Sequence, residues 1–534
     1  MKKALAILLA MSLLLLCAGC AGKTTTPAAT TADTEAAASA QTNTEGTAQE
    51  TSAEPTYKAK VRIGTVSDMP SACPFGNTSS QTAMVTNSTF DGLVRVDMSG
   101  NATEALATSW SANEDSSVWT FKLRQGVKFH NGDTFTAKDV KFTWEFAGDS
   151  SHEGIGKPVV GIDMVDSIET PDDYTVVFNL KYSTPDFLFY AAQKILCQNA
   201  VETLGVADGG KIGTGPYYLE SQKTGESWVI RRFDEYWGEK GITEQIEFVV
   251  ITDANSRALT LKAGDVDAIL EPNSADLASF VADGSYKVFK ERTVATFFLG
   301  FNHTEGKLTA DETVRRAVML AINRDDIINA CFEGGLCGSA SYNIITSVQP
   351  GFADVGHYDY DPEGAKKLLA DGGYEKLTLN LTAHPLFIPV AEVIQANLSM
   401  VGITVNIREI AQSNYAKNLM ADPSAYDMYI ANSSSTGGVL NVLDRFFGSS
   451  GIANCMFYQD PTFDSMLAEA KQSKTYDELI TAFGALQKRI AEETVPYTSL
   501  VDRYHFCVAS PAFDGVNLGN QAYDTNFSYC YVTQ

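Results

Sequence analysis

The residues that most often perform acid, base or metal chemistry are scattered along this sequence. Its six histidines form no HExxH pair, and Gly448-Ser449-Ser450-Gly451 is one residue too short for the G-x-S-x-G turn that presents a nucleophilic serine. The histidines are His130, His152, His303, His357, His384 and His505. We therefore expect no enzyme activity, no metal and no cofactor, and a secreted hydrolase is the most distant alternative.

Two glycine-containing segments superficially suggest nucleotide binding. Gly213-Thr214-Gly215-Pro216 lacks the third glycine of the dinucleotide fingerprint, and its proline removes an amide that a phosphate needs. Ala21-Gly22-Lys23-Thr24 has Cys17 where a phosphate-binding loop requires glycine. The net charge of −25 argues against nucleic acid, because binding a polyanion requires clustered Lys and Arg.

The N-terminus has the pattern of an export signal. Lys2 and Lys3 precede an apolar run at 4–16, which is shorter than the roughly 20 residues that span a bilayer. Ala18-Gly19-Cys20 resembles a bacterial lipobox, although Cys17 departs from its usual leucine. We expect residues 1–19 to be a lipoprotein signal peptide, Cys20 to be lipidated, and the Thr/Ala/Ser-rich residues 20–56 to form a disordered tether.

Seven of the nine cysteines lie beyond the signal and Cys20. Because seven is odd, at least one thiol stays unpaired in a monomer. Cys331 and Cys337 bracket a short loop that a disulfide could close, and the sequence leaves that pairing open.

Residues 119–145 predict a strand, a turn and a helix. Trp119, Phe121 and Leu123 alternate with polar residues, and Asn131-Gly132 supplies a tight turn. Thr136 followed by Asp139 predicts a capping box at the start of the helix. Further on, residues 377–381, 390–398 and 403–407 predict a strand–helix–strand crossover with parallel strands, which indicates an α/β region.

Residues 312–322 predict an amphipathic helix. Val314, Ala317, Val318, Ala321 and Ile322 share one apolar stripe, and Arg315 and Arg316 lie off it. Asn323 predicts the cap of a second helix. Asp361-Pro362-Glu363 predicts the start of a third, which Gly372-Gly373 ends.

The sequence of residues 119–145 resembles the signature of the family 5 solute-binding proteins of ABC importers. Gly213–Tyr218, Arg232–Gly238, Leu261–Asp267 and residues 297–324 resemble further motifs of that family, in the same order. The resemblance implies a periplasmic-binding-protein-like α/β fold of type II, cluster C, with two lobes and an inserted domain. The implied lobe 1 comprises 57–100, 212–296 and 505–534, the inserted domain II comprises 101–211, and lobe 2 comprises 297–504.

The same resemblance implies capture rather than chemistry. A peptide or similar small polar solute would be held between the lobes and delivered to membrane permease subunits driven by a cytoplasmic ATPase. We expect a monomer that binds no nucleic acid and is lipid-anchored through Cys20 to the outer face of the bacterial cytoplasmic membrane. A sensory receptor with this fold would have the same sequence features.

The ligand is less determined than the family. Peptide binders of the family follow a "yDm" strand with a tryptophan and an aspartate, whereas here Tyr426-Asp427-Met428 continues into 431–438 with neither. Peptides remain the first expectation, with an oligosaccharide, an opine or a metal chelate as alternatives. Asp68 or Asp444 is the expected source of a negative charge. The predicted ligand-binding residues are Ser67, Asp68, Met69, Asn302, His303, Tyr342, Asn343, Asn432, Ser433, Ser434, Ser435 and Asp444.

Overall fold

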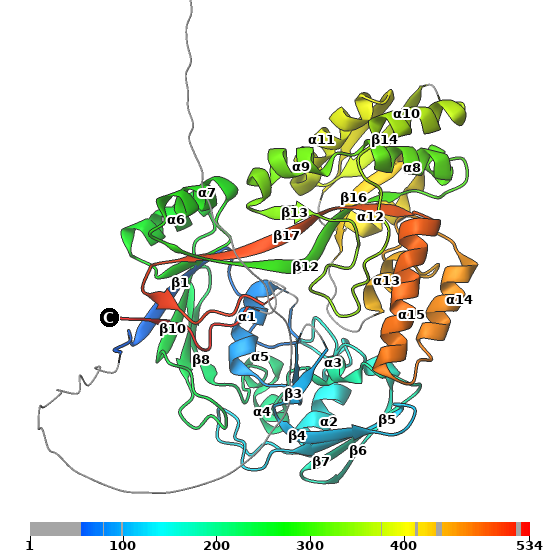
Figure 1. Ribbon diagram of the computed structural model, residues 1–534. Coiled ribbons are helices and arrows are strands. Elements are labelled where there is room, and N and C mark those ends of the chain that lie inside the picture. Colours follow the sequence, from blue (N-terminus) through cyan, green and yellow to red (C-terminus); the bar gives the residue numbers. More distant parts are fainter. Residues whose placement is uncertain are drawn as a thin grey trace, which may run out of the picture. The chain divides into compact units, whose positions relative to one another are not determined.

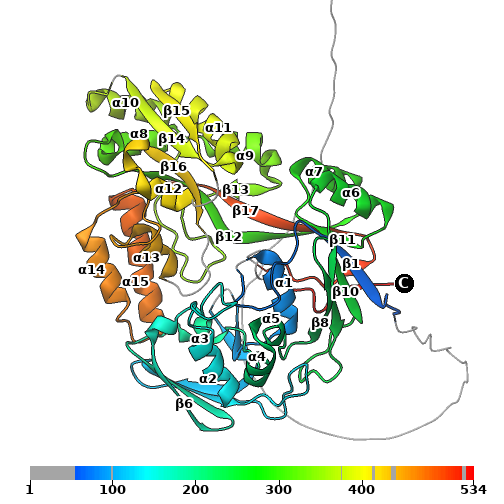
Figure 2. The same ribbon diagram turned by 180° about the vertical axis from the view of Figure 1, so that it is seen from behind.

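Two long antiparallel strands, β12 (Lys287–Phe301) and β17 (Tyr497–Ala509), lie in the middle of the largest sheet (Figures 1 and 2). The sheet has eleven strands in the order β15-β14-β16-β12-β17-β11-β1-β10-β9-β8, and β13 pairs with β17 beside this path. The computed structural model describes residues 55–77, 79–97, 100–374, 376–411, 415–433, 440–519 and 525–534.

One side of the β12–β17 pair carries five strands from residues 60–270. They are β1 (Lys60–Thr65), β8 (Tyr217–Lys223), β9 (Ser227–Arg232), β10 (Gln245–Val250) and β11 (Ala268–Leu270). Helices α1 (Ser80–Thr89), α6 (Ala254–Ala263) and α7 (Ser274–Asp283) belong to this part. Its core contains Tyr217, Trp228 and Phe248, whose large apolar surfaces are fully buried.

The other side contains the predicted crossover. β14 (Leu377–Ala383) and β15 (Ile403–Glu409) pair in parallel and are joined through α11 (Ile388–Ser399), which confirms that prediction. β16 (Met428–Ser433) and β13 (Gly338–Ala340) complete the strands. The predicted helices are α8 (Glu312–Ala321), α9 (Arg324–Cys331) and α10 (Pro362–Asp371), and Asn323 and Asp361 cap the last two as expected.

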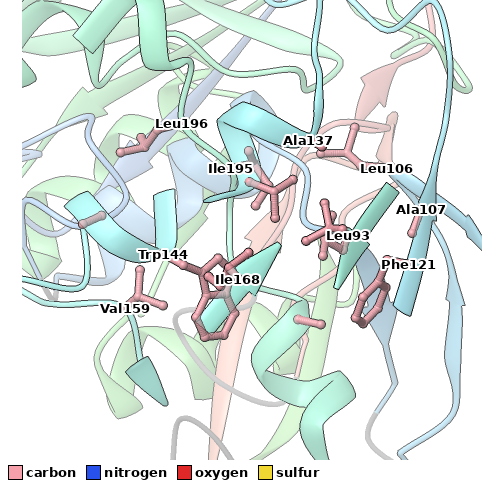
Figure 3. Packing of buried hydrophobic residues seen from close by; sticks show 14 of the residues in the cluster. Leu93, Leu106, Ala107, Phe121, Ala137, Trp144, Val159, Ile168, Ile195 and Leu196 are labelled. Carbon is pink, nitrogen blue, oxygen red and sulfur yellow. The ribbon is translucent and has the colours of Figure 1, made fainter. Parts of the chain in front are cut away.

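The strand of the 119–145 motif forms part of a separate antiparallel sheet in the order β4-β5-β7-β6. Its strands are β4 (Ala107–Ala112), β5 (Val118–Leu123), β6 (Val165–Asp172) and β7 (Thr175–Leu180), and α2 (Ala137–Phe146) follows the turn. Gly132 adopts the predicted positive φ of 89°. The Asp139 carboxylate accepts the Thr136 amide at 2.9 Å, as a capping box requires. Trp144 and Phe121 lie in the buried cluster of Figure 3.

The remaining elements complete the fold. The helices are α3 (Phe187–Ala191), α4 (Gln198–Leu204), α5 (Val206–Gly209), α12 (Tyr415–Ala421), α13 (Asn441–Phe447), α14 (Pro461–Ala470) and α15 (Tyr476–Lys488). The strands are β2 (Val94–Val96), β3 (Ala102–Glu104), β18 (Phe513–Asp514) and β19 (Tyr531–Val532). Single turns of 3-10 helix lie at Ile162–Met164, Leu308–Ala310, Glu333–Gly335, Pro385–Phe387 and Pro423–Ala425, and a π-helical turn lies at Arg489–Glu493.

The domain boundaries expected at 296/297 and 504/505 fall inside β12 and β17, so both strands continue across them. Cys73, Phe75 and Phe90, expected in lobe 1, pack in the same cluster as Trp144 of the inserted segment. The seven cysteines within the described residues are all free, Cys331 and Cys337 included. Over the same residues, no helix is long and apolar enough to span a membrane.

Arg315 departs from its predicted place on the surface of α8. Its side chain is buried, and its guanidinium donates to the carbonyl oxygens of Val495, Thr494, Thr309 and Ala310 at 2.8–3.0 Å. Helical periodicity placed it outside the apolar stripe, but the turn after the π-helical segment covers that part of α8. Arg315 thus satisfies carbonyl groups that would otherwise be buried without donors.

We expect Arg315→Met to lower the free energy of unfolding by about 2–4 kcal/mol, because several buried carbonyl groups lose their hydrogen-bond donor. Urea denaturation would measure the change. The control is Lys366→Met on α10. The Lys366 side chain is 46% exposed and pairs with exposed Glu363, so this substitution should change stability by less than about 0.5 kcal/mol. Equal effects of the two substitutions would contradict the structural role of Arg315.

Candidate ligand-binding site

A cavity of about 180 Å³ lies where β13 joins the β12–β17 pair. Arg292 reaches it from β12 and Asp502 from β17, and the segment after β13 supplies most of its other walls. The lining residues are Arg292, Ala340, Ser341, Tyr342, Asn343, Ile345, Ser347, Phe352, Ala353, Asp354, Val355, His357 and Asp502. The polar groups at this crossing suit binding of a small polar group.

Tyr342 is a predicted site residue that lines this cavity and is open to a ligand, because 40% of its surface is exposed. The Arg324 guanidinium lies 4.5 Å from the centre of its ring, and the His357 ring lies 4.3 Å away. Arg324 is itself buried and donates to the carbonyl oxygens of Ser341 and Ser499, both at 2.9 Å. Burial lowers the pKa of Arg324 to about 10, which leaves it charged at neutral pH. Contacts with Arg324 and His357 therefore hold the Tyr342 ring in position beside the cavity.

Asn343 shapes the segment that lines the cavity. Its amide nitrogen donates to Ala353 O and to Gln487 Oε1, both at 2.9 Å, and its oxygen accepts the Ile345 amide. Ser433, at the end of β16, donates its hydroxyl to Ile344 O at 3.2 Å, which brings β16 against the same segment. The tertiary structure therefore brings together three predicted residues: Tyr342, Asn343 and Ser433.

Asn432, the neighbour of Ser433 on β16, pairs with Phe297 of β12 and is exposed. Ser434 and Ser435, and the proposed lipidation site Cys20, lie outside the described residues.

Ser67, Asp68 and Met69 follow β1 as predicted, and the contacts of Asp68 and Met69 lie within that half. Asp68 accepts the Met69 amide at 2.7 Å and the Gly225 amide at 2.6 Å, which fixes the turn between β8 and β9. Met69 is 1% exposed and packs into the core of this half. Ser67 is half-buried beside them.

Asn302 and His303, two of the predicted ligand-binding residues, do not line this cavity and lie beyond the strand crossing. β12 extends beyond the crossing to Phe301, so both residues lie at its far end. Asn302 is fully buried and donates to Pro423 O and Tyr426 O at 2.7 and 3.0 Å. His303 packs its ring against Tyr458, and its Nε2 is buried without a hydrogen-bond partner among the described residues.

Asp444 is also separate from Tyr342. It accepts from Lys471 Nζ at 2.7 Å and lines a different cavity of about 430 Å³, together with Tyr182 and Asp186 of the inserted segment. Its charge is thus already compensated by an exposed partner.

Sequence reasoning missed Arg292, Asp502 and the supporting role of Arg324. Arg324 follows the helix that resembles a family motif, so that motif was the available signal. Nothing in the local pattern distinguished Arg292 or Asp502, since both lie in strands and meet only through pairing between distant segments. Among the described residues, no group of three or more His, Cys, Asp or Glu side chains is arranged to hold a metal ion.

The structure thus has a continuous sheet that joins two α/β halves and a polar cavity beside its crossing strands. The family model "Bacterial extracellular solute-binding proteins, family 5 Middle" matches residues 101–454. The chain belongs to this family, which is a family of binding proteins.

Two curated relatives and one solved structure illustrate the similarity. The chain is 27% identical to "Heme-binding protein A" of Haemophilus influenzae, over 79% of this chain and 82% of that protein. It is 28% identical to "Dipeptide-binding protein" of Pseudomonas aeruginosa, over 80% and 86%. The structure of the periplasmic binding protein DppA from Helicobacter pylori with the peptide STSA has a TM-score of 0.73 and 25% identity, over 90% of this chain and 99% of that one.

The partly buried ring of His303, whose Nε2 is fully buried, leads to a prediction about the effect of pH on stability. Burial, reinforced by the positive charge of Arg315, lowers its pKa to about 3, whereas an unfolded histidine titrates near 6.5. Between these values the unfolded chain binds a proton that the native protein does not, so stability present above pH 6.5 is lost as the pH falls.

We expect His303 alone to contribute a loss of about 2 kcal/mol between pH 7 and pH 5. Urea denaturation at both pH values should show a smaller loss for His303→Leu than for the wild type. Burial also lowers the pKa of His130 to about 4, so His130 contributes to the loss of stability in both the wild type and the variant. Identical losses in the two proteins would show that His303 is not a buried neutral imidazole.

Proposed function

We propose that this protein captures a peptide or a similar small polar solute between its two lobes and delivers it to the permease of an ABC importer. The observation that carries this proposal is the polar cavity at the strand crossing, where Arg292 of β12 and Asp502 of β17 meet Tyr342. A ligand bound there contacts both crossing strands and the segment after β13.

Closure of the lobes around the solute would supply the affinity. A ligand favours whichever arrangement of the lobes gives it better contacts, and hinge motion in binding proteins is absorbed by a few residues of the connecting segments. Micromolar affinity corresponds to about −8 kcal/mol, which modest polar contacts in a wet site supply. The closed form would dock on permease subunits that a cytoplasmic ATPase drives.

Peptides are the preferred ligand class because several relatives are named for them. The Pseudomonas aeruginosa relative is named a dipeptide-binding protein, and the Helicobacter pylori structure holds the peptide STSA. Both align over most of this chain.

The segment 431–438 favours a second candidate, a solute without a free ammonium group. It contains serine, threonine, asparagine and glycine but neither an aromatic residue nor a carboxylate. An oligosaccharide, an opine or a metal chelate fits hydroxyl and amide groups, and one relative is named for heme binding. A sensory receptor would share the same site and differ only in what the closed form contacts.

The proposed setting is the outer face of the bacterial cytoplasmic membrane. Cys20 would carry the lipid after removal of residues 1–19, and the Thr/Ala/Ser-rich residues 20–56 would tether a monomer. Mass spectrometry of the mature N-terminus tests this: a diacylated Cys20 is expected, and an unmodified or differently cleaved N-terminus would overturn the anchor.

A thermal-shift screen of residues 55–534 against di- to hexapeptides, oligosaccharides, opines and nickel chelates tests the ligand class. At 100 times its dissociation constant, a true ligand adds about 2.7 kcal/mol of stability and raises Tm measurably. We expect peptides to give the largest shifts. Stabilisation by sugars, opines or chelates with none by peptides would replace the peptide assignment with the second candidate.

A further inference from the structure

Asp502 is a buried carboxylate at the point where three strands meet. On β17 it lies between Thr296 of β12 and Ser339 of β13, which are its partners in the two ladders. Only 6% of its side chain is exposed, yet it lines the cavity that contains Tyr342. Burial is the main cause that raises the pKa of Asp502, because water is removed from the charged form.

The protein compensates this carboxylate only in part. Oδ2 accepts from Arg292 Nη1 at 3.4 Å, which is long beside the usual 2.7–2.9 Å of a charge-assisted hydrogen bond, and the same Nη1 donates to Ser347 Oγ at 3.0 Å. Oδ1 is buried and has no hydrogen-bond partner among the described residues. A buried carboxylate oxygen without a donor costs free energy.

The hydroxyl groups of Ser341 and Thr296 lie beside the carboxylate and lower its pKa. Each also has a carbonyl acceptor, because Ser341 Oγ donates to Asn343 O and Thr296 Oγ1 donates to Val501 O, both at 3.1 Å. A hydroxyl group has a single hydrogen, so these two groups satisfy the carboxylate only when they give up those carbonyl acceptors. Asp502 can therefore accept a hydrogen bond from a donor that enters the cavity it lines.

The other carboxylates considered as anchors are already used. Both oxygens of Asp68 accept backbone amides, and Asp444 is paired with Lys471. Asp427 of the "yDm" strand accepts the Asn380 amide at 2.8 Å and lies 3.6 Å from Lys307. Of these four, Asp502 alone combines an unpaired oxygen with a place in the cavity beside Tyr342.

We propose that Asp502 binds the ammonium group of the solute, in place of the carboxylate that segment 431–438 lacks. A cavity of about 180 Å³ admits an end group rather than a whole peptide. The cavity would therefore hold the amino-terminal residue of the ligand. The rest of the ligand then extends past the exposed ring of Tyr342. This inference rests on the proposed function and specifies its ligand as a solute with a free α-amino group.

The test uses the peptide that gives the largest Tm shift in the screen, together with its N-acetyl derivative. Calorimetry would measure both ligands with the wild type, with Asp502→Asn and with the matched control Asp444→Asn. We expect acetylation to weaken binding to the wild type and to Asp444→Asn by at least about 30-fold, because a buried charge partner is lost. Asp502→Asn should weaken binding of the free peptide to a similar extent.

The decisive quantity is the coupling between the two changes. If the ammonium group contacts Asp502, the Asp502→Asn variant should bind the acetylated peptide almost as tightly as the free peptide. Asp502→Ser provides a second variant of smaller volume, and the Tm of each variant without ligand verifies folding.

The outcomes separate the two proposals. A wild type that binds no free peptide overturns the proposed peptide function and this inference with it. Equal binding of free and acetylated peptide by the wild type, or independent effects of acetylation and Asp502→Asn, leaves peptide binding intact and overturns the role of Asp502.

Discussion

The pairing of β12 with β17 is the interaction on which the rest of this structure depends. Both strands continue from one α/β half into the other, so their hydrogen-bond ladder joins the two cores. Between the pairs Arg292–Tyr504 and Thr296–Asp502 the register advances four residues on β12 (296 − 292) and two on β17 (504 − 502). Such irregularities bend strands and redirect side chains, and here this one lies at the candidate site.

Buried arginines connect the chain around this ladder in a consistent way. Arg257, Arg315 and Arg324 are each 2–5% exposed, and each donates mainly to backbone carbonyl groups rather than to a carboxylate. The planar guanidinium has five donors, so one side chain satisfies several turns that regular secondary structure leaves without partners. Asp502 is the opposite case, a buried charge that the protein leaves under-compensated at a cavity.

The inserted segment also contacts the half that contains α14 and α15. Ser116 donates to Lys474 O at 3.0 Å, Ser183 donates to Ser473 O at 2.5 Å, and Phe189 packs against Tyr476. These contacts are few and mostly polar, in contrast to the continuous apolar cluster around Trp144. Residues 101–211 therefore share one apolar core with residues 73–94 and meet the α14–α15 part mainly through hydrogen bonds.

Local secondary structure could be predicted from the sequence, because turn residues, helix caps and the alternation of apolar residues act within a few positions. The α2 capping box, the Gly132 turn and the β14–α11–β15 crossover followed from those patterns, and several separated motifs pointed to the family. The pairing of Arg292 with Asp502, the burial of Arg315 and the displacement of Asn302 from the crossing were decided by the tertiary structure alone. Strand register, and the segments that cover each face, depend on contacts between distant residues, such as Arg292 and Asp502, which are 210 positions apart, and no local pattern encodes such contacts.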